Sequence, residues 1–372
     1  MTSAPVWEDG RGHAWPALQG DLRADTCVVG LGGSGLSAVL ELRARGSSAI
    51  GIDAGIVGGG AAGRNGGFLL AGLPEFYHDA VAQWGRDRSY ALYQQTLAEL
   101  DRIAAEPGAA VRRVGSLRIA ASDEELLDCD AQYDAMQADA LPVERYHGPE
   151  GTGLLVPGDG AFNPLQRCRT LAARADAAGA QLFEHSAALE IAGNQVTLAH
   201  GSVRCDRVIV AVDGRLEQLL PELAGRVRTA RLQMLATEPV PALTLPRPVY
   251  FRYGFEYWQQ LPDHRIAIGG FRDWAGDPEW TTDQVVSDAV QQRLERLLQE
   301  RLGVAAPITR RWAGLVGYSS GGLPVVAEAR PGVWAIGGYN GTGNVIGSIC
   351  GRGVAELALT GHAPLLDGLW PA

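Results

Sequence analysis

The sequence contains no lysine, because all 32 basic residues among its 372 residues are arginine. An enzyme of this composition cannot form a lysine Schiff base, hold phosphate with a P-loop lysine or use a lysine to assist the reduction of oxygen. Cysteine is also scarce: the five cysteines are odd in number, scattered, and never part of a C-x-x-C pair. A disulfide framework, a zinc–cysteine site and a dithiol reductase are therefore excluded.

Other absences narrow the function further. The seven histidines show no H-E-x-x-H or i, i+4 pairing, so we expect no metal site. No uninterrupted apolar run reaches the roughly 18 residues of a membrane span. The first residues lack the basic and apolar segments of a signal peptide, so we expect a cytoplasmic protein. The formal net charge of −10 argues against nucleic acid or an anionic membrane as a partner.

The composition is that of a globular protein, with 46% hydrophobic and 20% charged residues. A chain of 372 residues is longer than most single cores, which stop growing at about 250–300 residues, so two lobes are expected. Near the N-terminus, residues 25–30 form an apolar run that predicts a strand, residues 33–46 have helical spacing, and residues 48–53 predict a second strand.

Farther along, amphipathic patterns predict four long helices, at residues 89–105, 122–138, 165–178 and 281–302. Short strands are expected between residues 181 and 212. A second β-rich stretch, residues 227–271, carries aromatic residues at alternating positions. The chain closes with a strand at 333–337, a glycine-rich turn and a helix that runs to Gly361.

A dinucleotide-binding motif joins the first predicted strand to the first helix. The strand runs into Gly30-Leu-Gly32-Gly-Ser-Gly35, which matches G-x-G-x-x-G. The first glycine permits a tight turn, the second lets backbone approach a pyrophosphate, and the third lets helix and strand pack closely. The helix that starts here would direct its free N–H groups and the positive end of its dipole at the phosphates.

An acidic residue stands where such a motif needs one. Asp53 ends the second strand, where a carboxylate would accept hydrogen bonds from the ribose hydroxyls of an adenosine. An acid here favours an unphosphorylated ribose, so FAD or NAD is expected rather than NADP. The glycine pattern alone is a weak signal in a chain with 49 glycines. Strand, motif, helix, strand and acid follow in order, however, which favours a dinucleotide site over a simple glycine-rich turn.

The residues after Asp53 resemble a flavin-binding sequence. The stretch Ala54-Gly-Ile-Val-Gly58-Gly-Gly-Ala-Ala-Gly63-Arg64-Asn65-Gly66-Gly67 is similar to the G-A-S-G-R-N-G-G segment of FAD-dependent oxidoreductases in the D-amino-acid oxidase superfamily. The resemblance is closest to the branch of γ-glutamylputrescine oxidoreductases and glycine/sarcosine oxidases. Further similarity lies in Trp7, Leu18-Gln-Gly-Asp21, Tyr250-Phe-Arg, Arg265-Ile-Ala-Ile-Gly-Gly270, Trp312-Ala-Gly314, Gly322-Leu-Pro324 and Gly337-Gly-Tyr-Asn-Gly-Thr-Gly343.

This resemblance spans nearly the whole chain, although residues 79–150 contribute little. It implies an α/β fold with a Rossmann-type FAD-binding lobe, like that of glutathione reductase, and an interleaved α+β substrate lobe. The FAD-binding domain would comprise residues 1–78, 150–226 and 306–372. The substrate or cap domain would comprise residues 79–149 and 227–305.

The resemblance also implies non-covalent FAD, because covalent members attach the flavin through Cys or His and neither 58–67 nor 314–324 contains one. Glycines would let the backbone pass close to the flat ring. The helix that begins near residues 343–345 would point its N-terminus at the flavin and stabilise the charge of its reduced form. The residues expected to contact FAD are Gly30, Gly32, Gly33, Ser34, Gly35, Asp53, Ala54, Ala61, Ala62, Arg64, Asn65, Gly66, Gly67, Leu189, Ala211, Gly338, Asn340, Gly341, Thr342, Gly343 and Asn344.

Three departures from the family pattern bear on the substrate and the electron acceptor. Amino-acid oxidases of the family often carry an arginine shortly after W-x-G that clamps a carboxylate, but this chain has Val316 there. The branch's Tyr-Ser-Gly-His-Gly turn reads Tyr339-Asn-Gly-Thr342-Gly, so its histidine is replaced. Sarcosine-oxidase-like members use a lysine near the flavin to help reduce oxygen, and this chain has none.

The activity implied is oxidation of the C–N bond of a small amine or amino acid by hydride transfer to flavin N5. The imine would hydrolyse, and oxygen or another acceptor would reoxidise the flavin. This chemistry needs geometry and a dry site rather than a strong base. Arg252 could clamp a substrate carboxylate or make a surface salt bridge, and tyrosines could cage the amine or simply pack in a sheet. The candidate catalytic residues are Arg252, Tyr253, Tyr257, Tyr318 and Tyr339.

Several alternatives stay open. A flavin dehydrogenase would pass electrons to a quinone or carrier protein. A flavin-binding protein without catalytic activity would explain the replaced arginine and histidine. An NAD-dependent dehydrogenase is disfavoured by the Arg64–Gly67 stretch, and a disulfide reductase by the absence of a cysteine pair. A serine hydrolase is disfavoured at the glycine-rich turn after the first strand, because Ser34 is out of frame with a G-x-S-x-G elbow. Asp213 could bind a ligand or shape a turn.

Overall fold

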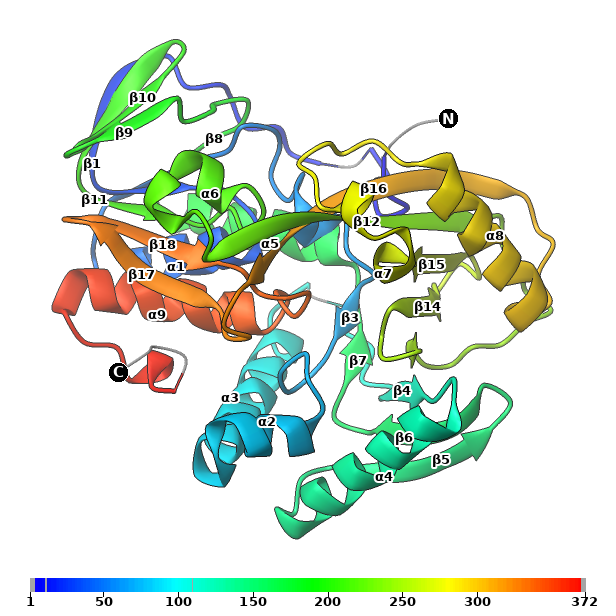
Figure 1. The fold of residues 1–372 in the computed structure, drawn as a ribbon. Coiled ribbons are helices and arrows are strands. Elements are labelled where there is room, and N and C mark those ends of the chain that lie inside the picture. The colour runs from blue at the N-terminus through cyan, green and yellow to red at the C-terminus, as the bar shows by residue number, and fades with distance from the viewer. Residues whose placement is uncertain (1–3, 11, 109, 369–372) are drawn as a thin grey trace.

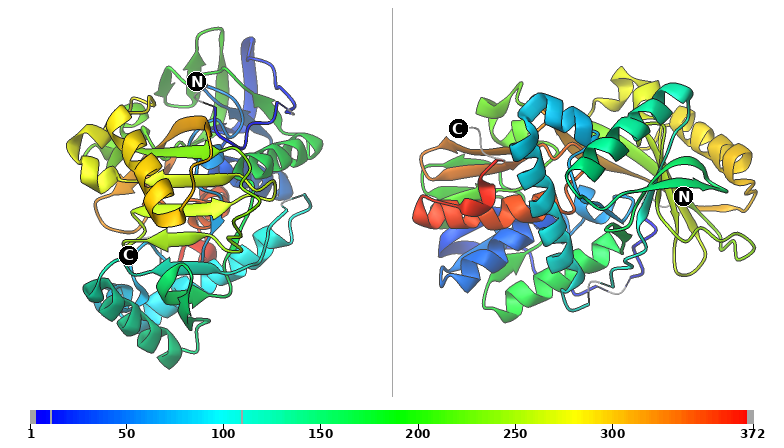
Figure 2. Two further views of the ribbon diagram at one scale, coloured as in Figure 1. Left: turned by 90° about the vertical axis from the view of Figure 1, so that its right-hand side faces the viewer. Right: turned by 90° about the horizontal axis from the view of Figure 1, so that it is seen from below.

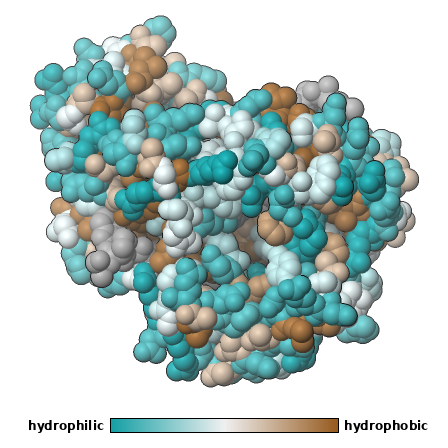
Figure 3. Space-filling model, in the orientation of Figure 1, coloured by the Kyte–Doolittle hydropathy of each residue, from teal (hydrophilic) through white to brown (hydrophobic). Residues whose placement is uncertain are grey.

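The computed structural model describes residues 4–10, 12–108 and 110–368. The ends of the predicted domain ranges, and residues 11 and 109 within them, lie outside the described residues. Two large β-sheets lie side by side, each with helices packed on it (Figures 1 and 2). On the face shown in Figure 3 the surface is mostly hydrophilic, and hydrophobic residues form small separate groups.

The first sheet has a parallel centre, which confirms the predicted Rossmann-type fold. Its parallel strands are ordered β18-β11-β1-β2-β8, with β17 antiparallel at one edge and a β9–β10 hairpin beside β11. The predicted strand–helix–strand unit is present as β1, α1 and β2. The bounds are β1 Gly20–Val29, β2 Ala49–Ile52, β8 Gln181–Phe183, β9 Glu190–Ala192, β10 Gln195–Leu198, β11 Gly201–Val210, β17 Val325–Arg330 and β18 Val333–Gly337.

Alternating side chains of the parallel strands enter two different cores. Val28 and Ile209 pack against helices α1, α5 and α9 on one face, whereas Cys27 and Val208 pack on the other, toward the β9–β10 hairpin and α6. Both faces of the sheet are therefore covered, as its continuous apolar strands require. These helices are α1 Gly33–Ala44, α5 Pro164–Ala177, α6 Leu216–Leu219 and α9 Ile346–Thr360.

The second sheet is mixed and contains eight strands in the order β16-β12-β15-β14-β13-β4-β6-β5. Its outer face packs against α8, where Leu294 and Leu298 contact a core that includes Leu235, Ile268 and Trp258. Its other face turns toward the first sheet (Figure 1). The bounds are β4 Ser116–Ile119, β5 Glu144–Gly148, β6 Gly151–Val156, β12 Val227–Thr237, β13 Val249–Phe251, β14 Glu256–Gln260, β15 Ile266–Gly270, β16 Ile308–Ser319 and α8 Asp288–Leu302.

The sheets depart from the predicted domain boundaries at two places. Residues 151–156 and 308–319 were expected in the FAD-binding domain, yet β6 and β16 are strands of the second sheet. β16 pairs with β12 along nearly its whole length, and this long antiparallel ribbon connects the two lobes. The division of the chain into a cofactor domain and a substrate domain stays a proposal, with these two strands moved to the second lobe.

One predicted helix starts too early. Residues 281–287 are not helical, and α8 begins at Asp288. The preceding segment is held against β12 by side chains, because Arg231 donates to the carbonyl of Val285 and the N–H of Ser287 donates to the side chain of Gln233. These tertiary hydrogen bonds compete with helical ones. Apolar spacing alone could not reveal them.

Helices α2 Tyr77–Trp84, α3 Arg86–Ala104 and α4 Asp123–Ala138 lie in the lower part of Figure 1 and contribute residues to the cavity described next. Within the described part of the chain, no helix is long and apolar enough to cross a membrane, and no group of three metal-binding side chains is found. All five cysteines are free and buried. The bounds of the other elements are β3 Phe68–Leu69, β7 Gly160–Ala161, α7 Arg272–Ala275 and the short 3-10 turns Ala61–Gly63, Pro221–Leu223, Asp277–Glu279 and Pro364–Leu366.

Candidate active site

The turn between β1 and α1 contains the three glycines of the motif. A Cβ atom at Gly30 would lie 2.7 Å from the carbonyl oxygen of Ala211, and one at Gly35 would lie 1.9 Å from the carbonyl oxygen of Gly30. Both positions therefore require glycine for backbone packing. Near a Cβ at Gly32, the described residues other than its chain neighbours present only the Cβ of Ala62, at 3.1 Å. The space beside Gly32 is open to a cofactor, as expected for the neighbour of a pyrophosphate.

The N-terminus of α1 can hold an anion. No side chain among the described residues caps this helix, and the first helical hydrogen bond is donated by the N–H of Leu36 to the carbonyl of Gly32. The N–H groups of the first turn precede that bond and have no partner within the helix. Together with the helix dipole they form a site that fits the pyrophosphate of a dinucleotide.

Asp53 holds the glycine turn closed. Its Oδ2 accepts a hydrogen bond from the N–H of Leu31 at 2.8 Å, and its Oδ1 accepts one from the N–H of Gly55 at 2.8 Å. Burial raises the pKa of this carboxyl, and the two backbone donors partly oppose that shift. Each oxygen retains a further lone pair, so the predicted hydrogen bonds to ribose hydroxyls are compatible with these contacts.

Asn65 and Asn344 join the two glycine-rich segments. Each amide donates to the other's Oδ1 at 3.1 Å, although the residues are 279 positions apart in the chain. Asn344 also donates to the carbonyl of Phe68 at 2.8 Å, and Oδ1 of Asn65 accepts from the N–H of Gly67 at 2.8 Å. Trp7 donates to the carbonyl of Asn65 at 2.9 Å. Both predicted flavin segments therefore meet at one place.

Arg64 stabilises the loop at residues 61–67 through its hydrogen bonds. Its guanidinium donates to the carbonyl of Gly59 at 2.8 Å and to the carbonyl of Ala313 at 3.2 Å. Trp312 donates its indole N–H to the carbonyl of Arg64 at 2.8 Å. The predicted W-x-G motif on β16 thus supports the loop at residues 61–67 directly.

The C-terminal glycine-rich turn is built around Asn340, which has a positive φ of 53°. Its Oδ1 accepts from the N–H of Ser319 at 2.8 Å, and its Nδ2 donates to the carbonyl of Gly322 at 2.8 Å. The hydroxyl of Thr342 donates to the carbonyl of Tyr339 at 2.8 Å. No side chain among the described residues caps α9, which starts just after this turn. That the N-terminus of α9 faces a flavin stays a prediction.

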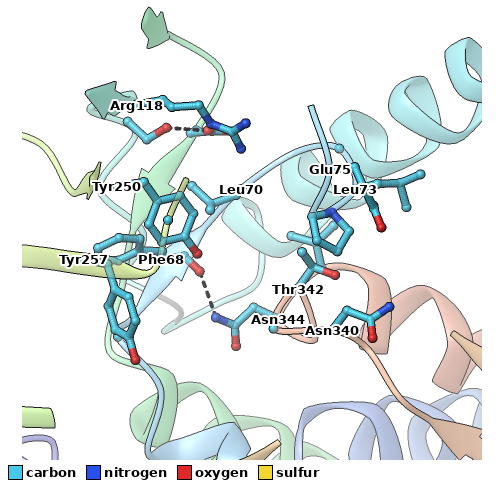
Figure 4. A pocket seen from close by; sticks show the side chains of 18 of the residues that line it. Phe68, Leu70, Leu73, Glu75, Arg118, Tyr250, Tyr257, Asn340, Thr342 and Asn344 are labelled. Atoms are coloured by element: carbon cyan, nitrogen blue, oxygen red, sulfur yellow. Dashed lines mark hydrogen bonds between the residues drawn. The ribbon is translucent and has the colours of Figure 1, made fainter. Parts of the chain in front are cut away.

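A cavity of about 350 Å³ lies between the glycine-rich segments and the second sheet. This volume is within the range of small-molecule sites. Aromatic rings form one wall (Figure 4). The ring centroid of Phe68 lies 5.1 Å from that of Tyr250 and 5.9 Å from that of Tyr257, and the centroids of the two tyrosine rings are 6.1 Å apart. Burial raises the pKa of both tyrosines and that of Tyr318, so these phenols stay neutral at pH 7.

Two carboxyl groups also line the cavity. Asp159 accepts hydrogen bonds from the hydroxyl of Ser116 at 2.6 Å and from the N–H of Ala71 at 2.8 Å. Full burial raises the pKa of Asp159 to about 7. Burial also raises the pKa of Glu75, whose Oε2 is buried and accepts no hydrogen bond from the described residues. Both oxygens of Asp159 therefore accept hydrogen bonds from the protein, whereas Oε2 of Glu75 can still accept one from a ligand.

Arg252 does not line this cavity, which overturns its expected role as a substrate clamp. Its guanidinium bonds Glu256 at 2.7 Å and Asp273 at 2.7 and 2.9 Å. Two carboxylates occupy the fork that a substrate would need. The sequence could not reveal this, because Asp273 is 21 positions away and reaches Arg252 only through the fold.

Tyr339, expected to be a catalytic residue, also lies outside the cavity. Its ring is 4% exposed within the main core and does not line the cavity. A Cβ at Gly343 would lie 3.1 Å from that ring, so the tyrosine packs beneath the turn. Asp213 accepts from the N–H groups of Gly317 and Tyr339, and burial raises its pKa to about 6. Of its two expected roles, the structure shows the turn-shaping one.

Leu189 was expected to contact FAD, but its surroundings do not indicate a cofactor site. Its side chain is 64% exposed, and its N–H already donates to the carbonyl of Thr197 in the β-hairpin. Tyr253 stands at the cavity margin, 42% exposed, with its hydroxyl bonded to Asp128. The predicted residues that do line the cavity are Ala61, Arg64, Asn65, Gly66, Tyr253, Tyr257, Tyr318, Asn340, Gly341, Thr342 and Asn344.

Several residues that line the cavity were not predicted from the sequence. Arg118 falls within residues 79–150, which contribute little to the family resemblance; Asp159 lies between β6 and β7, and Glu75 follows a proline in a loop. One usable signal existed for Arg118. It alternates with Leu117 and Ile119 in a short strand, and that alternation places it on the face opposite the buried pair.

Comparisons with known proteins agree with this geometry. The family model described as FAD dependent oxidoreductase (DAO) matches residues 25–357. A probable oxidoreductase OrdL of Rhizobium meliloti (strain 1021) is 28% identical over 383 residues, covering 95% of this chain and 87% of the relative. The γ-glutamylputrescine oxidoreductase of Escherichia coli (strain K12) is 27% identical over 389 residues, covering 94% and 87%.

Among solved structures, glycine oxidase from Geobacillus kaustophilus superposes with a TM-score of 0.74 at 21% identity, covering 91% of this chain and 95% of the other. L-proline dehydrogenase from P. horikoshii gives a TM-score of 0.75 at 18% identity, covering 94% and 96%. At these identities the likeness shows a shared fold, which confirms the predicted fold class.

Proposed function

Because the chain belongs to the family of FAD-dependent oxidoreductases, we propose that it oxidises the C–N bond of a small amine or amino acid. The relatives named after γ-glutamylputrescine, glycine and L-proline support this substrate class, since each name refers to an amine or amino acid. When bound, FAD supplies an acceptor for the hydride that leaves the carbon next to nitrogen. The resulting imine would hydrolyse in water.

The chain offers a set of contacts for each part of FAD. The N-terminus of α1 and the open space at Gly32 suit the pyrophosphate. Asp53 has lone pairs left for ribose hydroxyls. The loop held by the Asn65–Asn344 pair, with the uncapped N-terminus of α9 nearby, suits the flavin ring. We propose that these groups hold the cofactor.

The observation that carries the proposal is that one cavity is shared by the flavin segments and by an aromatic wall. Asn344, which pairs with Asn65, lines it from one side, and Tyr250 and Tyr257 line it from the other (Figure 4). A small substrate between them would be pressed against the ring position and shielded from water. Placement and exclusion of water are the main requirements of amine oxidation by flavin, and a strong base is not needed.

Glu75 is the residue we propose to bind the amine nitrogen. Its Oε2 is buried at the cavity with no hydrogen-bond donor among the described residues. An N–H of the substrate would satisfy this oxygen, and a carboxylate that lacks a partner is costly to leave buried. Replacement by Gln keeps the size of the side chain but removes its charge, so Glu75→Gln should weaken amine binding without unfolding the protein.

A second candidate is a dehydrogenase that passes electrons to a quinone or carrier protein. The observation that favours it is the absence of lysine, which removes the residue that related oxidases use to help oxygen react. The two candidates differ in one product. Only the oxidase forms hydrogen peroxide in air at the rate of substrate consumption.

The test is an anaerobic screen in which amines and amino acids are added to the holoenzyme and the flavin absorbance near 450 nm is followed. Bleaching by at least one compound is expected, and slower or weaker bleaching in Glu75→Gln. If no amine or amino acid bleaches the flavin, the protein is not an amine oxidoreductase. Peroxide measured after air is admitted then separates oxidase from dehydrogenase.

A further inference from the structure

Three arginines are among the described residues that line the cavity, and their guanidinium groups are held in different ways. Arg64 donates to backbone carbonyls. Arg272 stacks on the rings of Tyr318 and Trp280, at 4.5 and 5.1 Å. The guanidinium of Arg118 makes no hydrogen bond or ion pair with any described residue. It is held over the ring of Phe76, 4.2 Å from the centroid.

The charge of Arg118 is only partly balanced by its described neighbours. Asp159 interacts with it electrostatically but makes no ion pair with it; the oxygens of Asp159 accept from Ser116 and Ala71, and burial raises its pKa to about 7. A guanidinium is weakly hydrated, planar and suited to bidentate contact with a carboxylate. Stacking on Phe76 limits its motion before a ligand arrives, which lowers the entropic cost of binding.

The position of Arg118 follows from strand register. Arg118 on β4 pairs with Tyr250 on β13, and Tyr250 pairs with Tyr257 on β14. Paired residues point to the same face, and neighbouring strands are about 4.8 Å apart, so the backbone of Arg118 is about 10 Å from that of Tyr257. Tyr257 contacts the flavin loop, since a Cβ at Gly66 would lie 3.2 Å from its ring. Arg118 stands at the far end of this row (Figure 4).

We propose that Arg118 binds a substrate carboxylate at the end of the cavity remote from the flavin loop. Resting on the proposed function, this identifies the substrate class as an amine whose carboxylate is several bonds away from the C–N bond that is oxidised. An α-amino acid would be too short to reach both ends. The valine at the position of the usual clamp, Val316, is consistent with this, because no carboxylate is then held close to the reacting carbon.

The first test measures binding without turnover. Hexanoate and hexanol are titrated into the holoenzyme, and the change in the flavin spectrum gives Kd for each. We expect Arg118→Met to weaken hexanoate by roughly 30-fold or more, the loss typical of a desolvated charge partner, while hexanol is unaffected. Arg118→Lys should retain part of the affinity, because it keeps the charge but not the fork.

The matched control is Arg113→Met, which removes the same charge from the segment before β4. Arg113 pairs with exposed Asp101 and does not line the cavity, so hexanoate binding should be unchanged. FAD content and melting temperature show that each variant is folded. Equal hexanoate affinity in wild type and in folded Arg118→Met overturns the proposal, as does an equal loss in Arg113→Met.

The second test separates this inference from the proposed function. For 6-aminohexanoate, Arg118→Met should raise KM or the flavin-reduction Kd strongly, and for hexylamine it should change neither by more than about twofold. If no amine reduces the flavin but hexanoate binding depends on Arg118, amine oxidation fails and the anion site stands. If amines reduce the flavin and both substrates respond equally to the variant, only the anion site fails.

Discussion

Asn65 and Asn344 exchange two amide hydrogen bonds of 3.1 Å across the boundary between the N-terminal and C-terminal glycine-rich segments. Each amide has a further backbone partner, the N–H of Gly67 for Asn65 and the carbonyl of Phe68 for Asn344. The pair thereby fixes the loop at residues 61–67 against the turn that precedes α9. Both segments line the cavity, so the spacing between them sets the space available to a flavin ring.

The first prediction concerns this pair. Asn65→Ala and Asn344→Ala should each lower the free energy of unfolding by about 1–3 kcal/mol, because each leaves partly buried polar groups without partners. The double variant should cost less than the sum, with a coupling of about 0.5–3 kcal/mol. Urea unfolding of the four proteins measures the cycle. Strict additivity would show that the two amides act independently.

The second prediction assigns different roles to two glycines of the motif. Gly32→Val should fold and lose FAD, because its side chain would enter the open space that suits the pyrophosphate. Gly35→Ala should fail to fold, since its Cβ would meet the carbonyl oxygen of Gly30 at 1.9 Å. Gly321→Val is the control, since its Cβ would meet nothing within 4 Å. The absorbance ratio of flavin to protein reports FAD, and wild-type retention in Gly32→Val would contradict the motif assignment.

The third prediction is that FAD is bound without a covalent bond. No cysteine or histidine is among the described residues that line the cavity, and all five cysteines are buried. Acid precipitation should release the whole yellow colour into the supernatant. Colour that stays with the pellet would indicate a covalent attachment.

The fourth prediction follows from the ion pairs of Arg252. Glu256 has a side chain only 2% exposed, so Arg252→Ala leaves a buried carboxylate without its partner and should destabilise the protein by on the order of 3 kcal/mol. Adding Glu256→Gln should restore part of that loss. Kinetics should change equally for acidic and neutral amines. A selective loss with acidic substrates would instead return Arg252 to the site.

The fifth prediction is a pH dependence of stability. Burial raises the pKa of Asp159 to about 7, compared with about 3.9 in an unfolded chain. Its stabilising contribution is therefore complete below pH 3.9 and is lost as the pH rises through 7. Between pH 5 and pH 8 the wild type should lose about 2–3 kcal/mol from this group.

The matched variant is Asp159→Asn, which can accept from Ala71 and donate to Ser116 but does not titrate. Its free energy of unfolding, relative to wild type, should rise between pH 5 and pH 8. Urea unfolding at the two pH values measures this difference. A constant difference would mean that Asp159 titrates at its ordinary pKa.

Local features of the sequence were sufficient for the cofactor lobe. The G-x-G-x-x-G turn and Asp53 lie within one β-α-β unit. The residues of such a unit are close in the sequence, so its contacts can be predicted from the local pattern. The two glycine-rich segments also resemble known flavin segments by sequence alone. For these reasons the fold class and the family were predicted correctly.

Only the tertiary structure decided which charged side chains face the cavity. Arg252 was expected there and is instead neutralised by Glu256 and Asp273, while Arg118 was overlooked and faces the cavity without an ion pair to any described residue. The physical reason is that ion pairing depends on distance in space, and strands distant in sequence bring those charges together or keep them apart. The same pairing of distant strands placed β6 and β16 in the second sheet. Local pattern specifies an element, and its partners are specified by packing.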